Sequence, residues 1–570
     1  MTLPERSAKV RLTPGATVAL VQPPFEDFYH TEVRQIPLGL LSLAAVLQRY
    51  RLVLLDLRYG QRHPVSWPAA LRELAVYYRH RDVSPFGLYK NYYRFGLLPP
   101  DILRRLPEDC AVFLIAAMFT PYADTVVELI RLIRQARPAA WIVIGGSHAS
   151  IGYEEMLAAG ADFVIRGEGE LALPQLLSEL ERETPGLTQI PNLVARCGTQ
   201  LMVNPQQTIV DPDQLPYPLY DLTGLPVYRF RGKNHAMLIA SRGCPHRCRF
   251  CSVHQTMGTR YRLRSVANVL GEVALRLEQG FRSFDFEDDH FGGDRQWLNA
   301  LMDGLIERFS GYQIELAAMN GITASNLDEN ILRKMKRAGF SAINLALVTP
   351  SPQQQARYGR PVDTAGLFQI IAAARRSGLW VTTYLIIGMP GESAADNLGH
   401  ILQLASWPTL TGPSLFYLTP GTPLYEELQR DRVLPEASIC FRSSAFPFQR
   451  SDFTRREAMT LFRICRIINF VKGRIDEGCL PAGFEVDNEI VQVPPGLSGR
   501  EVQHRLGTTL LNLFRKSGVL YGTDGRTPQG YRLYREHCAD HLLTGFRKLR
   551  IEVAGIRSNA RIPDLWGLES

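Results

Sequence analysis

The chain has no long hydrophobic run and few cysteines, and each shortage excludes a broad class of protein. No stretch of the 570 residues approaches the roughly 18 uninterrupted apolar residues of a membrane-spanning helix, and the N-terminal segment lacks the apolar run of a signal peptide. Nine cysteines are too few for a disulfide scaffold. We therefore expect a cytoplasmic protein without a membrane span.

The net charge of the chain is also small. The 64 Lys and Arg residues and 56 Asp and Glu residues leave a net charge of +8, which is spread along the chain rather than gathered into a tail. No nucleic-acid partner is therefore predicted, whereas an anionic small molecule is compatible with this balance. Hydrophobic residues make up 45% and charged residues 21%, which excludes collagen-like, coiled-coil and wholly disordered chains.

The first part of the chain alternates short apolar runs with helical patterns. Near-continuous apolar strands between helices indicate a doubly wound parallel sheet that is covered on both faces. The expected strands are 16–24, 51–58, 111–119, 140–146 and 161–170. Ligands of such sheets lie beyond the carboxyl ends of the strands, here at 23–24, 118–122, 145–148 and 166–170.

Two segments interrupt the alternation of strands and helices. An insertion at 59–109 is rich in aromatic and basic residues. We interpret it as a helical surface excursion, and a lid over a ligand is the alternative. Residues 176–230 include a Pro-rich stretch and are interpreted as a linker between domains.

A second array of strands and helices follows the linker. Six apolar strands, from AMLIAS at 236–241 to SLFYLTP at 414–420, alternate with five helices and predict a partial (β/α)6 barrel. The predicted organisation is an α/β domain at 1–175, the linker at 176–230, the barrel at 231–430 and a mostly helical region at 431–570.

Three of the cysteines lie close together after the first barrel strand. Cys244, Cys248 and Cys251 are separated by three and then two residues, so their thiolates can converge on one metal centre. Zinc usually takes four ligands, and His246 and His254 are the nearest candidates for a fourth. Three cysteines alone suit a four-iron four-sulfur cluster that leaves one iron open. The motif by itself leaves both possibilities open.

The cysteine triplet at the head of this array resembles the radical S-adenosylmethionine (SAM) enzymes. Three later segments agree with that family in order and spacing, namely FEDDHF at 286–291, YLIIGMPGES at 384–393 and LTPGTPLYE at 418–426. The resemblance implies a 4Fe-4S cluster held by the three cysteines, whose open iron binds SAM for reductive cleavage to a 5′-deoxyadenosyl radical. It also implies a flavodoxin- or ferredoxin-like electron donor.

The resemblance further implies a set of residues that contact SAM. They are Phe250, Asp288, Asp289, Thr349, Ile386 and Gly388. Phe250 would shield the cluster from water, and the aspartates would offer a carboxylate to the ammonium group of SAM. Core packing is the alternative for Phe250, and a solvated acidic turn or helix cap is the alternative for the aspartates. Where many relatives have Glu-Ser, this chain has Val348-Thr349, so only a hydroxyl is retained for the carboxylate of SAM.

The N-terminal segments VQPPF, IPLGLLSLAAVLQ, VLLDLR, WIVIGGSHAS and FVIRGEGE resemble the cobalamin-binding domain of many radical SAM proteins. This resemblance implies corrinoid contacts from residues at the strand ends. They are Pro23, Pro24, Gly145, Gly146, Ser147, Gly167 and Glu168. A tight strand-to-helix turn is the alternative role of the two adjacent glycines.

One motif of that domain is missing. The Asp-x-His-x-x-Gly motif that supplies a lower cobalt ligand does not occur after the second strand, and His63 lies too far along the chain to replace it. Cobalamin binding without a histidine ligand and retention of the fold without cobalamin both remain open.

The two resemblances together imply a cobalamin-dependent radical SAM enzyme. Methyl transfer to an unactivated carbon of a small-molecule or natural-product substrate is the expected reaction. Cyclisation, rearrangement or oxidation, with or without cobalamin, is the first alternative, and a non-catalytic zinc protein is the second. The four C-terminal cysteines lack paired spacing and are expected to be buried thiols: Cys440, Cys465, Cys479 and Cys538.

Overall fold

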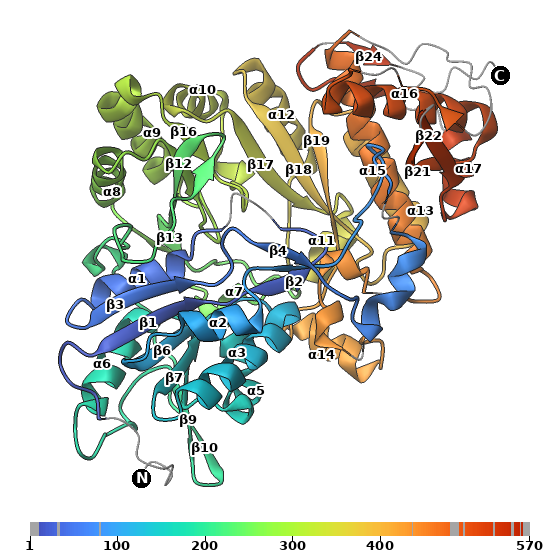
Figure 1. Ribbon diagram of the computed structural model, residues 1–570. Helices are drawn as coiled ribbons and strands as arrows, with labels where there is room; N and C mark the ends of the chain where they lie inside the picture. The colour runs from blue at the N-terminus through green and yellow to red at the C-terminus, as the bar shows by residue number, and fades with distance from the viewer. Residues whose placement is uncertain are drawn as a thin grey trace.

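The structure is a computed structural model (Figure 1). It describes residues 11–30, 35–78, 81–435, 437–447, 449–478, 490–493, 496–527, 530–548, 552–558 and 560–562. Cys479 lies outside these residues. None of the helices within them is both long and apolar enough to cross a bilayer.

The N-terminal domain is built on a seven-stranded sheet with the order β10-β9-β8-β7-β6-β1-β3. Its parallel strands are β1 (Thr17–Gln22), β3 (Arg51–Asp56), β6 (Cys110–Ala116), β7 (Trp141–Gly145) and β8 (Phe163–Ile165). Along β1, Val18 and Leu20 pack into one hydrophobic cluster and Ala19 and Val21 into another, so both faces of the sheet are covered. The prediction of a doubly wound parallel sheet is confirmed.

Helices cover the two faces of this sheet in two groups (Figure 1). Residues of α1 (Leu38–Val46) and α6 (Gly169–Leu180) belong to the first cluster. Residues of α3 (Ala123–Ala136) and α5 (Tyr153–Ala159) belong to the second. The strand ends therefore remain free to face the rest of the molecule.

The segment expected to be a linker is partly regular structure. Strands β9 (Leu193–Cys197) and β10 (Gln200–Val203) form an antiparallel hairpin that extends the first sheet next to β8. The apolar pattern does not predict this hairpin, because its apolar run is short and the residues of its edge strand β10 are half-exposed or exposed. The irregular, Pro-rich connection thus begins after residue 203 rather than at 176.

The second domain has the six parallel strands of the predicted partial barrel. They are β12 (Lys233–Leu238), β15 (Ser283–Phe286), β16 (Glu315–Ala317), β17 (Ala342–Val348), β18 (Trp380–Ile387) and β19 (Leu410–Leu415). Single bridges such as Ile322 to Leu345 join the two halves of the barrel. The helices between strands are α8 (Val266–Glu278), α9 (Arg295–Phe309), α10 (Glu329–Ala338), α12 (Thr364–Arg376) and α13 (Ala394–Ala405).

The last barrel strand lies earlier than the apolar pattern predicts. Strand β19 runs from Leu410 to Leu415, whereas the expected strand is 414–420. It contains Pro413 and pairs only with β18, and an edge strand tolerates a proline because it has no second partner to bond. Beyond β19, Phe416 and Leu418 pack into a separate hydrophobic cluster, and residues 417–419 line a cavity.

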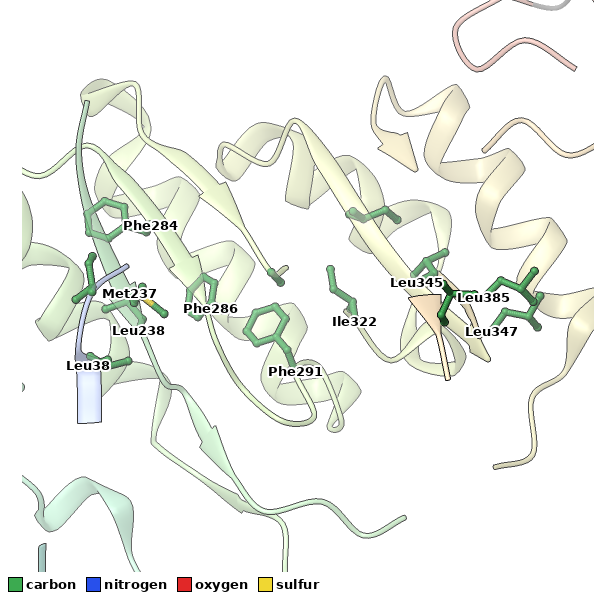
Figure 2. Packing of buried hydrophobic residues seen from close by; sticks show 14 of the residues in the cluster. Leu38, Met237, Leu238, Phe284, Phe286, Phe291, Ile322, Leu345, Leu347 and Leu385 are labelled. Atoms are coloured by element: carbon green, nitrogen blue, oxygen red, sulfur yellow. The ribbon is translucent and has the colours of Figure 1, made fainter. Parts of the chain in front are cut away.

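One continuous hydrophobic core joins the two domains (Figure 2). Phe284, Phe286 and Phe291 form its aromatic centre, with rings of Phe286 and Phe291 stacked at 4.6 Å. Leu38 of α1 lies beside the first barrel strand. The domains therefore share buried apolar surface, which fixes one against the other.

The C-terminal region is mainly helical, with α14 (Pro423–Arg430) leading into α15 (Arg455–Asp476), α16 (Gly499–Ser517) and α17 (Asp540–Lys548). It also holds a small antiparallel sheet of β20 (Ile490–Val491), β22 (Gly530–Arg535) and β21 (Tyr521–Thr527). Helix α15 lies beside β18 and β19 (Figure 1). Cys465 and Cys538 are buried here and Cys440 is half-buried.

The insertion at 59–109 is packed into the molecule and is not a helical surface excursion. Its strands β4 (Arg62–Pro64) and β5 (Tyr93–Phe95) form a small sheet with β2 (Phe25–Asp27), and its first helical turns are the 3-10 segment η2 (Ala69–Val76). Tyr78, Phe86 and Tyr92 are buried. The ring of Phe86 meets that of Phe470 on α15 at 5.4 Å, because the aromatic side chains gain most by packing against the C-terminal region.

Candidate functional site

The three clustered cysteines lie in a loop that a short hairpin closes. Strand β13 (Ser241–Arg242) pairs with β14 (Arg262–Leu263) in antiparallel register, and residues 243–261 form the loop between them. Gly243 has φ +77°, and a Cβ there would lie 2.4 Å from the carbonyl oxygen of Arg260. Only glycine fits this turn, which directs the chain into Cys244.

The three thiols are close enough to influence one another. Burial raises the pKa of each, to about 11 for Cys251, and negative charge on Cys248 raises the pKa of both Cys244 and Cys251 further. The guanidinium of Arg360 opposes the shift at Cys244 and Cys248. Three mutually repelling thiolates beside one arginine need a cationic centre to remain ionised.

The donor set fits a multi-iron cluster better than a single ion. Within the described part of the chain, no three His, Cys, Asp or Glu side chains are gathered tightly enough for one metal ion. Zinc would need four ligands around one centre. In a four-iron cluster, by contrast, each cysteine binds its own iron, and the thiols stay further apart. The ring of His246, one candidate for a fourth zinc ligand, packs edge-on against His290 at 5.0 Å.

The two adjacent aspartates after β15 have different surroundings. Asp288 is buried, and its carboxylate accepts hydrogen bonds from the Ala240 backbone N–H at 3.1 Å and from the Ser241 hydroxyl. Asp289 is exposed, yet desolvation by the surrounding walls raises its pKa to about 6. Asp288 therefore fixes the chain just before the cysteine loop. Asp289 also accepts a hydrogen bond from the Gly243 backbone N–H, and it is the more exposed of the two carboxylates.

The Thr349 hydroxyl is already used inside the protein. It donates to Glu392 at 2.6 Å and accepts from the Ser351 backbone N–H at 3.2 Å. A hydroxyl with its one proton committed cannot also donate to the carboxylate of SAM. Val348 beside it has φ +67°, a strained conformation for a β-branched residue. Burial raises the pKa of Glu392 to about 7, which favours the protonated acid.

Phe250 and Ile386 meet in one apolar cluster. Both pack against a group that includes Val348, Tyr358 and Met389, and the rings of Phe250 and Tyr358 are 6.1 Å apart. The packing interpretation of Phe250 therefore holds. Its position directly before Cys251 is also compatible with a shield around that thiol.

Gly388 follows β18 at a turn that requires glycine. Its φ is +83°, and a Cβ would lie 2.7 Å from the ring of Phe453 in the C-terminal region. Its N–H donates to Asn397 at 3.1 Å and its carbonyl oxygen accepts from Arg450 at 3.2 Å. The C-terminal region thus fixes the loop after the fifth barrel strand from outside.

A cavity of about 840 Å³ lies between the two domains. Its floor consists of residues at the carboxyl ends of β1, β3, β6 and β7, including Pro23, Pro24 and Ser147. From the barrel side it is lined by Ser252, the residue after Cys251, and by 417–419; the C-terminal region adds 441–444. The cavity therefore connects the strand ends of the first sheet with the cysteine loop.

The other four residues expected at a corrinoid do not line this cavity. Gly145 and Gly146 form the turn between β7 and α4 (Ser147–Ile151), and a Cβ on Gly146 would lie 2.6 Å from the Ala117 carbonyl oxygen. Gly167 packs against the Thr256 carbonyl oxygen, 2.7 Å from a built Cβ. Glu168 is fully buried in ion pairs with Arg242 and Arg262. Their role as corrinoid contacts stays a prediction, and the structure shows that each of these positions also takes part in packing or ion pairs within the protein.

Several large side chains on the cavity wall are exposed to solvent when no ligand is bound. Phe119 is 59% exposed and Met118 45%, and the other large exposed side chains on the wall are Tyr29, Tyr59 and Tyr417. Exposed apolar side chains gathered in one cavity indicate a sizeable ligand with apolar faces. A corrin ring fits this requirement. His63, by contrast, is not among the lining residues and contacts Gln61 at 3.1 Å.

Sequence reasoning missed several residues of the cavity wall. Arg58, His148 and Arg442 line it, and none of them was among the expected corrinoid contacts, although Arg58 and His148 lie within the segments VLLDLR and WIVIGGSHAS. Position at a strand end was an available signal for His148, since 145–148 was recognised as such an end. No such signal exists for Arg442, which reaches the cavity only because the C-terminal region folds back.

The first domain is a doubly wound parallel sheet, the second is a partial (β/α)6 barrel, and the cavity between them adjoins the loop with the three cysteines. The family model described as B12 binding domain matches residues 30–177, and the one described as Radical SAM superfamily matches residues 238–404. The chain therefore belongs to the radical SAM proteins that carry a B12-binding domain, as the sequence predicts.

Relatives of known name share part of the chain. An uncharacterized methyltransferase of Pyrococcus horikoshii is 28% identical over 49% of this chain and 60% of its own length. Cytidylyl-2-hydroxyethylphosphonate methyltransferase of Streptomyces wedmorensis is 26% identical over 77% of this chain and 86% of its own length. The chain thus spans well over half of each relative.

Solved structures share the fold. The radical SAM methyltransferase TsrM from Kitasatospora setae, solved with cobalamin and a [4Fe-4S] cluster, has a TM-score of 0.55 at 18% identity, covering 73% of this chain and 78% of TsrM. The cobalamin-dependent radical enzyme OxsB, solved with aqua-cobalamin and SAM, has a TM-score of 0.52 at 18% identity, covering 76% and 57%.

Proposed function

We propose that this protein is a cobalamin-dependent radical SAM enzyme that transfers a methyl group to an unactivated carbon of a small-molecule substrate. The observation that carries this proposal is the cavity shared by the strand ends of the first sheet and the cysteine loop, where Ser252 follows Cys251 directly. Within it a methyl carrier and a radical source would stand next to one another.

The residues of the chain supply binding, orientation and exclusion of water. Cys244, Cys248 and Cys251 would hold the cluster, which when bound supplies the electron that cleaves SAM. Asp289 would accept a hydrogen bond from the ammonium group of SAM, because Asp288 is committed to Ala240 and Ser241. The apolar wall formed by Met118 and Phe119 would cover one face of a corrinoid and exclude water from it.

No side chain of the described cavity replaces the missing histidine of the Asp-x-His-x-x-Gly motif at its expected place. The residues of segment 56–63 that line the cavity are 58–62, and none of them is a histidine. We therefore propose cobalamin binding without a histidine from this segment. Of the expected corrinoid contacts, we retain Pro23, Pro24 and Ser147.

A second reaction class has support from two relatives that are named as cyclases. The anaerobic magnesium-protoporphyrin IX monomethyl ester cyclase of Cereibacter sphaeroides is 25% identical over 58% of this chain and 55% of its own length. Radical cyclisation without methyl transfer is thus the alternative. For either reaction we propose a flavodoxin- or ferredoxin-like electron donor and a reducing, cytoplasmic setting that keeps the cluster thiolates available.

The test uses anaerobically reconstituted protein with hydroxocobalamin, a chemical reductant and methyl-deuterated SAM. We expect 5′-deoxyadenosine, S-adenosylhomocysteine and deuterated methylcobalamin. Formation of 5′-deoxyadenosine without labelled methylcobalamin would favour the cyclisation alternative. Bound zinc without iron, and no 5′-deoxyadenosine, would contradict a radical enzyme of either kind.

A further inference from the structure

The hairpin that holds the three cysteines has an unusual charge composition. Residues 241–263 contain five arginines and no aspartate or glutamate. Two of these arginines, Arg242 and Arg262, stand directly opposite each other in the β13–β14 pair that closes the loop. Like charges at opposed positions of an antiparallel pair destabilise it, and more so when buried. The hairpin thus carries a charge conflict at its own base.

The conflict is resolved by carboxylates from the other domain. Glu168, at the end of β8, accepts from Arg242 Nη1 at 2.8 Å with one oxygen and from Arg262 Nη1 at 2.7 Å with the other. Glu170 accepts from Arg242 Nη2 at 2.6 Å. The four side chains carry two positive and two negative charges, so contact between the domains balances the charge of this buried group. Within the barrel itself, the carboxylate of Asp289 also interacts electrostatically with Arg242 and Arg262.

Glu168 is the central member of this group. Its side chain is fully buried, and the oxygen that binds Arg262 also accepts the Ile209 backbone N–H at 2.8 Å. Arg262 in turn donates to the carbonyl oxygens of Ile209 and Met257, at 2.5 and 2.6 Å. Met257 lies within the cysteine loop. The contacts therefore run without a gap from the first domain into the loop that carries the thiols.

We propose that Glu168 is a positioning residue that holds the cysteine hairpin closed, so that retention of the cluster depends on contact with the cobalamin-binding domain. This inference rests on the proposed function, because it assumes that the three cysteines hold a cluster. It differs from the expected corrinoid contact, since Glu168 faces the barrel and not the cavity.

The test compares wild type with Glu168→Gln, which keeps the shape and the acceptor for Ile209 but removes the charge. We expect the reconstituted variant to hold less than about half of the wild-type iron and sulfide, since one buried cation is left uncompensated. In the protein without a cluster, amides of 243–261 should exchange at least about tenfold faster than in wild type. Circular dichroism should show an unchanged helix content.

Two further variants separate charge from packing. Glu536→Gln removes an equally buried carboxylate, paired with Arg463 at 2.6 Å in the C-terminal region, and should leave iron content unchanged. Adding Arg242→Gln to Glu168→Gln removes one charge of each sign and also the opposed arginine pair. We expect the double variant to hold more iron than Glu168→Gln alone.

The inference would be overturned by wild-type iron content and loop exchange in Glu168→Gln, by an equal loss of iron in Glu536→Gln, or by a double variant that holds no more iron than the single one. Loss of cobalamin with full retention of the cluster would also overturn it, in favour of a corrinoid contact. Wild-type protein that binds no iron would instead refute the proposed function. The exchange rates of the loop would still decide whether Glu168 holds the hairpin.

Discussion

The two halves of the candidate site are built in different ways. The cysteine loop draws all three of its candidate ligands from eight consecutive positions, 244–251. The cavity beside it draws its wall from the first sheet, from the barrel and from 441–444 in the C-terminal region. A ligand site within one loop leaves a motif in the sequence, whereas a site assembled from distant segments leaves only scattered side chains.

The cysteine loop and the cavity are also stabilised by different contacts. The loop is closed by a two-residue strand pair whose charges are balanced from another domain. The cavity is bounded by Asp27, which accepts from Tyr122 at 2.7 Å and from Ser444 at 2.8 Å and pairs with Arg442 at 3.2 Å. Both halves therefore depend on contacts between regions, but only the loop has ligands recognisable without them.

The largest expected effect tests the loop. Replacing Cys248 with Ala should abolish 5′-deoxyadenosine formation, because a cluster deprived of one of three ligands is not retained. Replacing Cys465, a fully buried thiol on α15, with Ala is the matched control and should leave the amount of 5′-deoxyadenosine unchanged. Product quantification by chromatography checks both. Equal activity in Cys248→Ala and wild type would remove the loop from the site.

The second prediction tests whether the C-terminal region belongs to the cavity. Arg442→Met leaves the buried Asp27 carboxylate without its arginine and should lower the free energy of unfolding by about 3–5 kcal/mol. Cobalamin retained after gel filtration should fall as well. Arg500→Met, at an arginine that is 78% exposed in its pair with Glu477, should cost less than about 1 kcal/mol. Denaturant titration measures both, and equal stabilities would show that the region only covers the barrel.

The third prediction concerns the pH dependence of stability in the loop that follows β18. The pKa of Glu392 is raised from 4.5 to about 7, chiefly by desolvation, so between these values the folded protein binds more protons than the unfolded chain. Its contribution is present below pH 4.5 and is lost as the pH rises towards 7. Relative to Glu392→Gln, wild type should lose up to roughly 3 kcal/mol over that interval.

Unfolding titrations at several pH values check this third prediction, with Glu278→Gln, on the surface of the barrel, as the control. A difference between Glu392→Gln and wild type that does not change with pH would mean that the carboxyl group is ionised throughout. In that case Glu392 could not act as the neutral partner of Thr349.

The smallest expected effect tests the apolar wall. Phe119→Ser should weaken cobalamin binding about tenfold, because the ligand then covers less apolar surface, while the free energy of unfolding stays close to wild type. Val210→Ser changes an equally exposed apolar residue, 68% exposed, that is not part of the cavity wall and should have no effect. Absorbance titration with hydroxocobalamin gives both affinities. Identical affinities would place the corrinoid elsewhere.

Local patterns explain why most of the architecture is predictable. The five parallel strands of the first sheet are apolar at successive positions, which is possible only where both faces are covered. The hairpin of β9 and β10 and the start of β19 were not recognised. Strand β10 is an edge strand with half-exposed or exposed residues, and β19 is an edge strand that contains Pro413, so their position at a sheet edge and not their apolar content determines them.

The sequence by itself determined the two domains, the alternation of strands and helices, and the loop that places Cys244, Cys248 and Cys251 together. Those features depend on neighbours along the chain. Only the tertiary structure decided that Asp288 fixes the backbone before the cysteine loop, that Thr349 donates a hydrogen bond to Glu392, and that Glu168 faces the barrel. These roles depend on hydrogen bonds and ion pairs between groups that are far apart in the sequence. Patterns among neighbouring residues do not predict which distant groups meet.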